Sequence, residues 1–315
     1  MAYVVKRVGM LVVTWLLLSL VVFGLAALVP GDPASAILGP YATEERILLL
    51  QREMGMSGSW LSRYWIWLSR VVRGDFGYAY SLDLPVARVV WRRLGPTLLL
   101  SSAALCFAVS AGLSVGMLSA RRARKRDGLL LSALSLVGIS MPTFVLALLF
   151  MLLFAAWAGL YPVSGMHDAL GSGWRVRDIA AHLVLPALSL GVVSASVIAR
   201  LTRRYALDAE SDEYVRVARA KGLPENAVFY RHIFRTALAR VIPVIGLQAG
   251  FVLGGAVYVE SVFQWPGLGR LLVDAVEKRD LMLMQGTVLV LATAYVLTSL
   301  AADLVQRAID PRVEA

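Results

Sequence analysis

The segment GLSVG, from Gly112 to Gly116, has the G-x-S-x-G spacing that presents a nucleophilic hydroxyl in serine hydrolases. That chemistry needs a strand before the turn, a helix after it, and Asp and His partners further along the chain. Here the five residues lie inside a long apolar run that favours an unbroken helix. We therefore interpret Ser114 as a packing residue and predict no catalytic residue in this chain.

Motifs that bind metals or nucleotide phosphates are also missing. Cys106 is the single cysteine and lies in an apolar run, so we expect it to pack as a small hydrophobic residue. The histidines His167, His182 and His232 are scattered, and no H-E-x-x-H occurs. The phosphate-binding pattern G-x-x-x-x-G-K-[ST] is absent from the sequence. We predict no metal site and no cofactor bound by this chain. If the protein is a pump, its ATP must be hydrolysed elsewhere.

The composition is that of a membrane protein. Of the 315 residues, 58% are hydrophobic and 17% are charged, and the mean hydropathy is +0.70. A soluble domain carries about a quarter charged residues. The net charge of +10 would by itself suggest a nucleic-acid partner. The basic residues are distributed as membrane topology requires, so we predict no nucleic-acid binding.

Stretches of about 20 apolar residues are long enough to cross a bilayer as helices, and they predict six spans. The spans lie roughly at residues 8–28, 97–120, 129–158, 179–199, 238–259 and 281–302. The first follows Lys6 and Arg7, as the apolar part of a signal peptide would. Its apolar stretch is about twice as long as that of a signal peptide, so we expect a retained helix.

The basic residues predict the orientation, because Lys and Arg in short loops stay on the cytoplasmic side. They gather before the first span, between the second and third, and between the fourth and fifth. These residues are Lys6, Arg7, Arg121, Arg122, Arg124, Lys125, Arg126, Arg200, Arg203, Arg204, Arg216, Arg219, Lys221, Arg231 and Arg235. We therefore expect both termini in the cytoplasm.

Residues 31–96 would then form an extracytoplasmic segment that is long enough to be ordered. Within it, SWLSRYWIWLSRVVRG places Trp60, Tyr64, Trp65 and Trp67 among apolar neighbours. The pattern fits a helix that lies in the membrane interface, where aromatic rings gather. It fits equally a helix that is buried against the spans.

Prolines and one histidine fall within the predicted spans. Pro142, Pro186 and Pro243 each remove a backbone donor and can kink a helix. Membrane bundles tolerate such kinks where other helices or a water-filled path satisfy the freed carbonyl, so Pro142 is a candidate for the translocation path. His182 lies near the outer end of the fourth span and has two interpretations: a solvated interfacial side chain, or a contact to substrate or metal.

Small residues line one face of the fifth predicted span. Gly246, Gly250 and Gly254 recur at every fourth position, which permits close helix approach. Either this face packs tightly inside the subunit, or it belongs to a subunit interface or translocation path. Gln248 is the one strongly polar side chain of that span and is a further candidate for the path.

A charged stretch, EYVRVARAKG from Glu213 to Gly222, interrupts the apolar sequence on the predicted cytoplasmic side. Ser211 or Asp212 can cap a helix start, Glu213 suits the positive end of the helix dipole, and Gly222 can end the helix. We expect a helix of about three turns, followed by a second helix from Pro224 that leads into the fifth span. For an arbitrary loop, a solvated connector would be the default interpretation.

This stretch resembles the EAA loop of ABC importer permeases. The matching positions are Glu213, Ala218, Ala220 and Gly222, followed about twenty residues later by Ile242 and Pro243. Where that family usually has Ala-Ala, this chain has Tyr214-Val215, a common variant in the peptide branch. In the family, the loop forms a coupling helix that docks into a cleft of the ATPase subunit.

Other segments resemble the dipeptide, oligopeptide and nickel permease branch, in the same order along almost the whole chain. They are VPGDPA (29–34), GDFGYAYS with LPV (74–86), SMPTF (140–144), LPALSLG (185–191), ESVFQWPGLGRLLVDA (260–275) with Arg279 and Asp280, and DPR (310–312). The resemblance implies that ATPase coupling involves Glu213, Tyr214, Val217, Ala218, Arg219, Ala220 and Gly222.

The resemblance implies an all-α membrane protein of the type I ABC importer permease fold, with six transmembrane helices and a cytoplasmic coupling helix. Such a chain is a pore-forming subunit in the bacterial plasma (inner) membrane, and it is not itself an enzyme. It would import peptides, nickel or metal chelates by alternating access. Its partners would be a second permease subunit, two ATPase subunits that bind ATP and Mg, and an extracytoplasmic binding protein.

The implied organisation has four parts. They are an N-terminal transmembrane helix (1–30), an extracytoplasmic segment with interfacial helices (31–96), a five-helix permease core (97–305) with the coupling loop at about 208–243, and a cytoplasmic tail (306–315).

Two other classes compete with an ABC permease. A secondary transporter or channel without an ATPase would be favoured by inverted repeats or by charges within the spans, and the sequence shows neither. A membrane enzyme would need a catalytic constellation, for which GLSVG is the best match. The substrate stays open, although the short outer loop from Gly159 to Asp178 slightly favours nickel, a metallophore or a short peptide.

Overall fold

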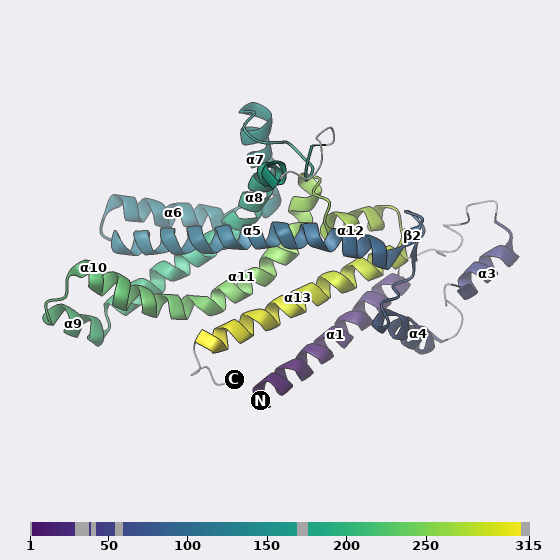
Figure 1. Ribbon diagram of the computed structural model, residues 1–315, viewed down its shortest axis with the longest axis horizontal. Coiled ribbons are helices and arrows are strands. Elements are labelled where there is room, and N and C mark those ends of the chain that lie inside the picture. Colours follow the sequence, from purple (N-terminus) through teal and green to yellow (C-terminus); the bar gives the residue numbers. More distant parts are fainter. Residues whose placement is uncertain (1, 29–37, 39–41, 54–58, 169–175, 310–315) are drawn as a thin grey trace. The chain divides into compact units, whose positions relative to one another are not determined.

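The fold is described from a computed structural model of the chain, which describes residues 2–28, 38, 42–53, 59–168 and 176–309 (Figure 1). The VPGDPA and DPR segments lie outside these residues. The described part of the chain is helical apart from turns, loops and one short hairpin. This result confirms the prediction of an all-α protein.

Two compact units make up the chain, and each is described by itself. Unit 1 consists of Met1–Pro96 and Gly267–Val296, and unit 2 consists of Thr97–Pro266 and Leu297–Ala315. Helices α5 (Val86–Arg121) and α13 (Leu281–Ile309) each contribute a stretch to both units.

Unit 1 combines helices with a short hairpin. Its other elements are α1 (Ala2–Leu28), α3 (Glu44–Glu53), α4 (Trp60–Val72), β1 (Tyr78–Ala79), β2 (Leu84–Pro85) and α12 (Leu268–Glu277). The two strands are antiparallel, with Tyr78 opposite Pro85 and Ala79 opposite Leu84. The Asp280 carboxylate accepts hydrogen bonds from the backbone N–H of Ser81 (2.9 Å) and of Leu283 (3.1 Å). One carboxylate therefore holds the hairpin turn and caps the start of α13.

The aromatic helix α4 packs against α1. The Phe23 ring of α1 contacts the rings of Trp60, Tyr64 and Trp67, and Ser19 and Tyr64 share a hydrogen bond of 2.9 Å between their hydroxyl oxygens. The packing interpretation of this segment is therefore correct for one face of the helix. The other face exposes Leu61, Trp65 and Ile66, a composition that suits a membrane interface.

Unit 2 is built around helix α8 (Val176–Glu210), which packs against α6, α7 and α11. Its other elements are α6 (Arg126–Ser140), α7 (Thr143–Phe150), the π-helical segment η1 (Met151–Trp157), α9 (Glu213–Ala220), α10 (Glu225–Ala227), the π-helical segment η2 (Val228–Ile233) and α11 (Phe234–Val262).

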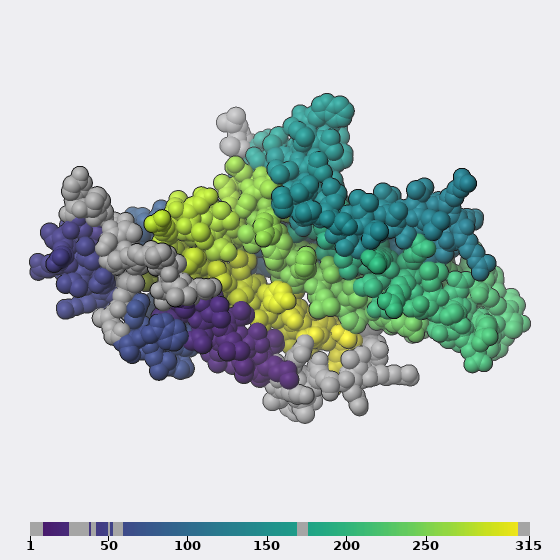
Figure 2. All heavy atoms as spheres, turned by 180° about the vertical axis from the view of Figure 1, so that it is seen from behind, coloured from purple at the N-terminus to yellow at the C-terminus, as the bar shows by residue number. Residues whose placement is uncertain are grey.

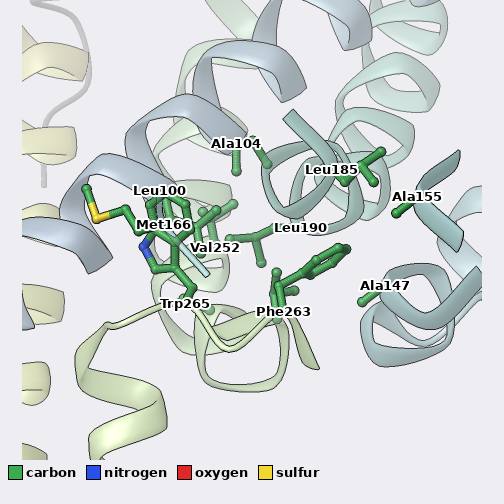
Figure 3. Packing of buried hydrophobic residues seen from close by; sticks show 13 residues of the cluster. Leu100, Ala104, Ala147, Ala155, Met166, Leu185, Leu190, Val252, Phe263 and Trp265 are labelled. Atoms are coloured by element: carbon green, nitrogen blue, oxygen red, sulfur yellow. The ribbon is translucent and has the colours of Figure 1, made fainter. Parts of the chain in front are cut away.

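The ESVFQWPG part of the ESVFQWPGLGRLLVDA segment serves the core of unit 2. Phe263 and Trp265 are fully buried, together with Leu185 and Leu190 of α8 (Figure 3). Glu260 is also fully buried, and its Oε1 accepts a hydrogen bond of 2.7 Å from the Thr97 hydroxyl. This bond joins α11 to α5.

Apolar helices long enough to cross a membrane are present among the described residues. Four such helices occur: Val86–Arg121, Val176–Glu210, Glu225–Val262 and Leu281–Arg307. A bent pair, Arg126–Ser140 with Thr143–Trp157, makes five if it counts as one span. A shorter apolar helix covers Gly9–Gly24. The described chain thus has the helices of a multi-pass membrane protein.

The third predicted span, 129–158, is divided at Pro142, the proline that was expected to be able to kink it. The chain breaks at Met141 and Pro142, and the helices on either side are bent by 106°. Met141 is extended, as residues before proline usually are, and Pro142 is extended as well. The Pro142 carbonyl accepts hydrogen bonds from the N–H of Val145 and of Leu146. Pro142 therefore starts a new helix, whereas the sequence predicted a kink in an old one.

The GLSVG segment lies inside helix α5, which confirms that it is no hydrolase elbow. A Cβ at Gly112 would lie 2.7 Å from the Ile198 Cβ, and a Cβ at Gly116 would lie 2.5 Å from the Ala199 carbonyl oxygen. The two glycines thus let α5 approach α8 closely, as small residues do in membrane helix pairs.

The sequence predicted Ser114 as a packing residue and Cys106 as a packed small hydrophobic residue, but both are exposed on α5. The physical reason is that a membrane helix is apolar on its lipid-facing side as well as on its buried side. Apolar neighbours in the sequence therefore do not indicate which face of such a helix is buried.

We predict that Gly116→Ala destabilises unit 2. The added Cβ would lie 2.5 Å from the Ala199 carbonyl oxygen and 2.6 Å from the Thr202 Cβ, so α5 and α8 must separate. Overpacking of this kind costs about 1–3 kcal/mol. The measurement is thermal unfolding of the purified protein in detergent. The control is Gly95→Ala in the same helix, where a Cβ meets nothing within 4 Å. An unchanged melting temperature for Gly116→Ala would contradict the proposed close contact.

Candidate functional site

Helix α9 carries the charged stretch singled out in the sequence and lies at one end of unit 2, together with α10 (Figure 1). Figure 2 shows this green region as an exposed projection of the unit. The helix has eight residues, Glu213–Ala220, which is just over two turns and shorter than the three turns expected. Gly222 follows with a φ of +76°, which confirms its predicted role as a left-handed helix stop.

The N-cap of α9 differs from the expected arrangement. Asp212 occupies the N-cap position, but its side chain makes no cap hydrogen bond. Instead, its carboxylate lies 3.8 Å from the Arg240 guanidinium of α11, and the Ser211 hydroxyl donates back to the Asp208 carbonyl. The Asp212 side chain therefore links α9 to α11.

One face of α9 is buried in a small apolar cluster. Val215 and Ala218 pack with residues of α5, α8, η2 and α11, namely Met117, Ala206, Ala209, Val228, Phe229, Ile233 and Ala237. Apolar packing therefore holds helix α9 against unit 2. Ala218, which was predicted from the sequence as a coupling residue, lies in this buried cluster.

The other face of α9 and the following turn is exposed. It combines apolar and charged side chains at Glu213, Tyr214, Arg216, Val217, Ala220, Lys221, Gly222 and Leu223. Five of the seven sequence-predicted coupling residues are therefore exposed, while Ala218 is buried and Arg219 is half-buried. Three further residues that were not predicted as site residues are also exposed here: Arg216, Lys221 and Leu223.

Arg219 points back to its own unit. Its guanidinium donates to both carboxylate oxygens of Glu225 (2.6 and 3.1 Å) and to Glu210 Oε1 (3.1 Å). The hydrogen bonds and negative charges of Glu225 and then Glu210 raise the pKa of Arg219 above its usual value. Arg219 therefore remains a cation at any physiological pH and joins α9 to α8 and α10.

Other basic residues near α9 are also bound within the unit. Arg121, at the end of α5, donates to Asn226 and to the Tyr230 hydroxyl, and its guanidinium lies 5.7 Å from the centre of the Phe229 ring. Arg203 of α8 donates to the Ser119 hydroxyl (2.9 Å) and to the Gly128 carbonyl (3.1 Å). These arginines fasten the turns beside α9, a role that their positions in the sequence do not indicate.

The three glycines of α11 have different surroundings. Gly246 faces Ala302 of α13, with 2.8 Å between an added Cβ and the Ala302 Cβ, and Gly250 is buried. Gly254 is exposed, and an added Cβ would meet nothing within 4 Å. Gln248 is half-buried. Gly246 and Gly250 therefore pack inside the subunit, whereas Gly254 does not.

Helix α11 also exposes large side chains that the sequence analysis missed. Leu247, Phe251 and Tyr258 are 75%, 65% and 60% exposed. Their spacing places them on the same helical face as Gly254. The signal in the sequence was the recurrence of large residues at helical spacing, which the glycine pattern obscured.

His182 is buried, so the interpretation as a solvated side chain is wrong. Its Nδ1 lies 2.9 Å from the Asp178 carbonyl oxygen and 3.1 Å from the Asp178 Oδ1. The described residues contain no group of three or more His, Cys, Asp or Glu side chains that could hold a metal ion. His182 thus contacts Asp178, which lies one turn earlier in the same helix.

Comparison with known proteins identifies the family. Residues 112–315 match the family described as "Binding-protein-dependent transport system inner membrane component", and residues 1–101 match the corresponding N-terminal family. The chain therefore belongs to the binding-protein-dependent transport system inner membrane component family, which comprises permease subunits of ABC importers. It is a pore-forming subunit of an ATP-driven importer and a multi-pass inner-membrane protein.

Relatives and solved structures agree with this assignment. The "Glutathione transport system permease protein GsiC" of Salmonella typhimurium (strain LT2) is 38% identical over 311 residues, covering 99% of this chain and 98% of the relative. The protein of the same name from Escherichia coli (strain K12) is 37% identical with the same coverage. The inward-facing MetNI methionine ABC transporter shares the fold, with a TM-score of 0.56, 18% identity, and coverage of 70% of this chain and 96% of that chain. An amino acid ABC transporter with histidines gives a TM-score of 0.54 at 18% identity, covering 72% and 94%.

These findings confirm the family inferred from the charged stretch and from the order of the other segments. Permeases of this family work with ATPase subunits and substrate-binding proteins. A secondary transporter or channel that works without an ATPase, the competing function, does not fit a chain of this family.

We predict that Gly222→Ala loosens α9. An L-residue other than Asn or Asp pays about 1 kcal/mol or more in the left-handed region, so the end of the helix should open about fivefold more often. Hydrogen–deuterium exchange of peptides from 213–223 measures this opening. Gly222→Asn should exchange more slowly than Gly222→Ala, because Asn tolerates the left-handed region better. Identical exchange in wild type and Gly222→Ala would argue against a strained position.

Proposed function

We propose that the chain crosses the inner membrane six times with both termini in the cytoplasm, and that α9 is the helix that couples it to an ATPase subunit. The four long apolar helices, the bent pair and the apolar helix α1 would together make the six crossings. Basic residues at the α5–α6 turn and around α9 support the orientation, because short cytoplasmic loops retain them.

The proposed parts are an N-terminal helix (1–30), an extracytoplasmic segment with interfacial helices (31–96), a permease core (97–305) and a cytoplasmic tail (306–315). The assembly would contain a second permease subunit, two ATPase subunits and an extracytoplasmic binding protein. ATP and Mg would be bound by the ATPases and not by this chain.

The observation that carries the proposal is the exposed face of α9. Val217 and Leu223 are 47% and 41% exposed, and Arg216 and Lys221 beside them are exposed as well. Apolar side chains that gather on a surface rimmed by polar ones mark a contact site for another protein. The surface is basic, so an apolar cleft with acidic side chains at its rim is the complementary partner.

Motion would pass from α9 to the translocation path through α11. The segment Glu225–Val262 forms one long helix. Helix α9 is joined to it by the ion pair between Asp212 and Arg240. A hydrogen bond of 2.9 Å from the Tyr214 hydroxyl to Thr236 joins them as well. Closure of the two ATPases on ATP would move α9, and the attached helix would switch the path between its inward-facing and outward-facing states. Hydrolysis would reset it.

The exposed face of α11 is the proposed wall of the path. Leu247, Phe251, Gly254 and Tyr258 share this face with Thr236 and Arg240, the residues that bind α9. A tyrosine hydroxyl is costly to place in lipid hydrocarbon without a hydrogen-bond partner, and it suits a water-filled path. Pro142 and Gln248 are further candidates for contacts within the path.

The proposed substrate class is short peptides. Relatives at 37–38% identity over nearly the whole chain are named as glutathione transport permeases, and glutathione is a tripeptide-like molecule. Nickel and metal chelates, which the sequence analysis held open, receive no such support.

We expect Glu213→Lys and Gly222→Asp to leave the protein in the membrane and to reduce the amount of ATPase that co-purifies with it. Glu213 and Gly222 define the two ends of α9. Glu213→Lys puts a positive charge at the positive end of the helix dipole and Gly222→Asp puts a negative charge at its negative end, so either change disturbs the docking surface. The control is Arg204→Gln on α8, because the Arg204 side chain is 73% exposed and its pairing with Asp208 is a loose 3.9 Å contact. Co-purification at the wild-type level together with intact transport would sink the assignment of α9.

We also expect cysteines at Phe251 and Tyr258 to react with a water-soluble maleimide in native membranes, at rates that change when ATP is trapped on the ATPases. The exposed Cys106 must first be replaced by Ser. Leu130→Cys on α6, where Leu130 is 64% exposed, is the lipid-facing control, and Val252→Cys is the buried control. If Tyr258→Cys reacts no faster than Leu130→Cys, this face of α11 contacts lipid and the proposed path is wrong.

A further inference from the structure

The three basic residues of α9 and its following turn do not behave alike. Arg216 and Lys221 are exposed, whereas Arg219 is half-buried and contacts two carboxylates of its own unit. An ATPase that approaches α9 would therefore meet Arg216 and Lys221, while the guanidinium of Arg219 is already occupied.

Arg219 joins three consecutive elements. Its contact to Glu225 is two-pronged, at 2.6 and 3.1 Å, and its contact to Glu210 is 3.1 Å. Glu210 ends α8, Arg219 lies in the last turn of α9, and Glu225 begins α10. The guanidinium therefore joins the end of α8 to the start of α10, on either side of α9.

Different contacts hold the other end of α9, where the helix starts. Asp212 lies 3.8 Å from Arg240, and the Tyr214 hydroxyl donates to Thr236 at 2.9 Å. These contacts lie at the start of the helix, and Arg219 lies at its end. An eight-residue helix is marginal by itself, so contacts at both ends are needed to make it move as one body with α8 and α11.

The charges make Arg219 hard to replace. Without it, Glu210 and Glu225 lose the guanidinium that joins them, and like charges repel. Lysine keeps the charge but presents a point charge in place of the planar fork that binds one carboxylate through two hydrogen bonds.

We propose that Arg219 is a positioning residue of the coupling step: it holds the end of α9 to α8 and α10, so that force on α9 moves α11 and does not bend the loop. This inference rests on the proposed function of α9. It differs from a role for Arg219 as a contact to the ATPase, because its hydrogen bonds are made within its own subunit.

The first test uses the purified permease without partners. In Arg219→Gln, hydrogen–deuterium exchange of peptides from 210–225 should rise at least about fivefold, with an intermediate value for Arg219→Lys. Arg204→Gln should exchange as the wild type does, because Arg204 is exposed on α8 and loosely paired. Wild-type exchange in Arg219→Gln would overturn the inference.

The second test uses the complex with its ATPases in native membranes. Arg219→Gln should retain the co-purifying ATPase, but the change in maleimide labelling at Tyr258→Cys on ATP trapping should fall about fivefold or more, the range of a typical coupling energy. The paired change Arg219→Glu with Glu225→Arg restores an opposite-charge pair and should recover part of the response. Loss of the ATPase in Arg219→Gln without recovery in the paired variant would make Arg219 a docking residue and overturn the inference.

Failure of this inference and failure of the proposed function give different results. If Glu213→Lys reduces ATPase docking while Arg219→Gln responds as wild type, α9 is the coupling helix and Arg219 does not position it. If neither Glu213→Lys nor Gly222→Asp affects docking, the proposed function of α9 fails, whatever the exchange data show for Arg219.

Discussion

The close approach of α5 and α8 is the contact on which unit 2 depends. Gly112, Gly116 and Gly191 have neighbours within 2.5–2.8 Å of where a Cβ would lie, so the two helices meet almost backbone to backbone. Helix α8 also packs against α6, α7 and α11, and its end leads directly into α9. In a bilayer, helices gain little from hydrophobic burial against each other, so packing of this closeness and hydrogen bonds must hold the bundle.

Polar contacts also hold the turns around α9 in place. Arg203, Arg121 and Arg219 each bind groups on neighbouring elements and so fasten the turns around α9. Basic residues of a membrane protein can thus hold its loops together through their hydrogen-bond geometry as well as carry charge. One face of α9 is exposed, while its buried face and both ends are tied to the subunit. A surface held in this way is suited to transmit displacement.

The family of the protein could be predicted from the sequence, whereas several local features of the structure could not. The order of the quoted segments and the spacing of Glu213, Gly222 and Pro243 identified an ABC importer permease, which the comparisons confirm. The sharp break at Pro142 and the exposure of Ser114 and Cys106 were not predicted. Proline predicts disturbance but not its angle, and a uniformly apolar helix does not reveal which face is buried.

The sequence by itself determined what is local or repeated along the chain: apolar runs of membrane length, the clustering of basic residues, and a glycine at the end of α9 whose φ of +76° only a few residue types tolerate. Only the tertiary structure decided which side chains of one motif are exposed and which bind groups of their own subunit. Arg219 and Arg216 are three residues apart in the same helix, yet one binds Glu210 and Glu225 and the other is exposed. The difference arises because Glu210 belongs to α8 and Glu225 to α10, so that neither carboxylate lies within the stretch Glu213–Gly222.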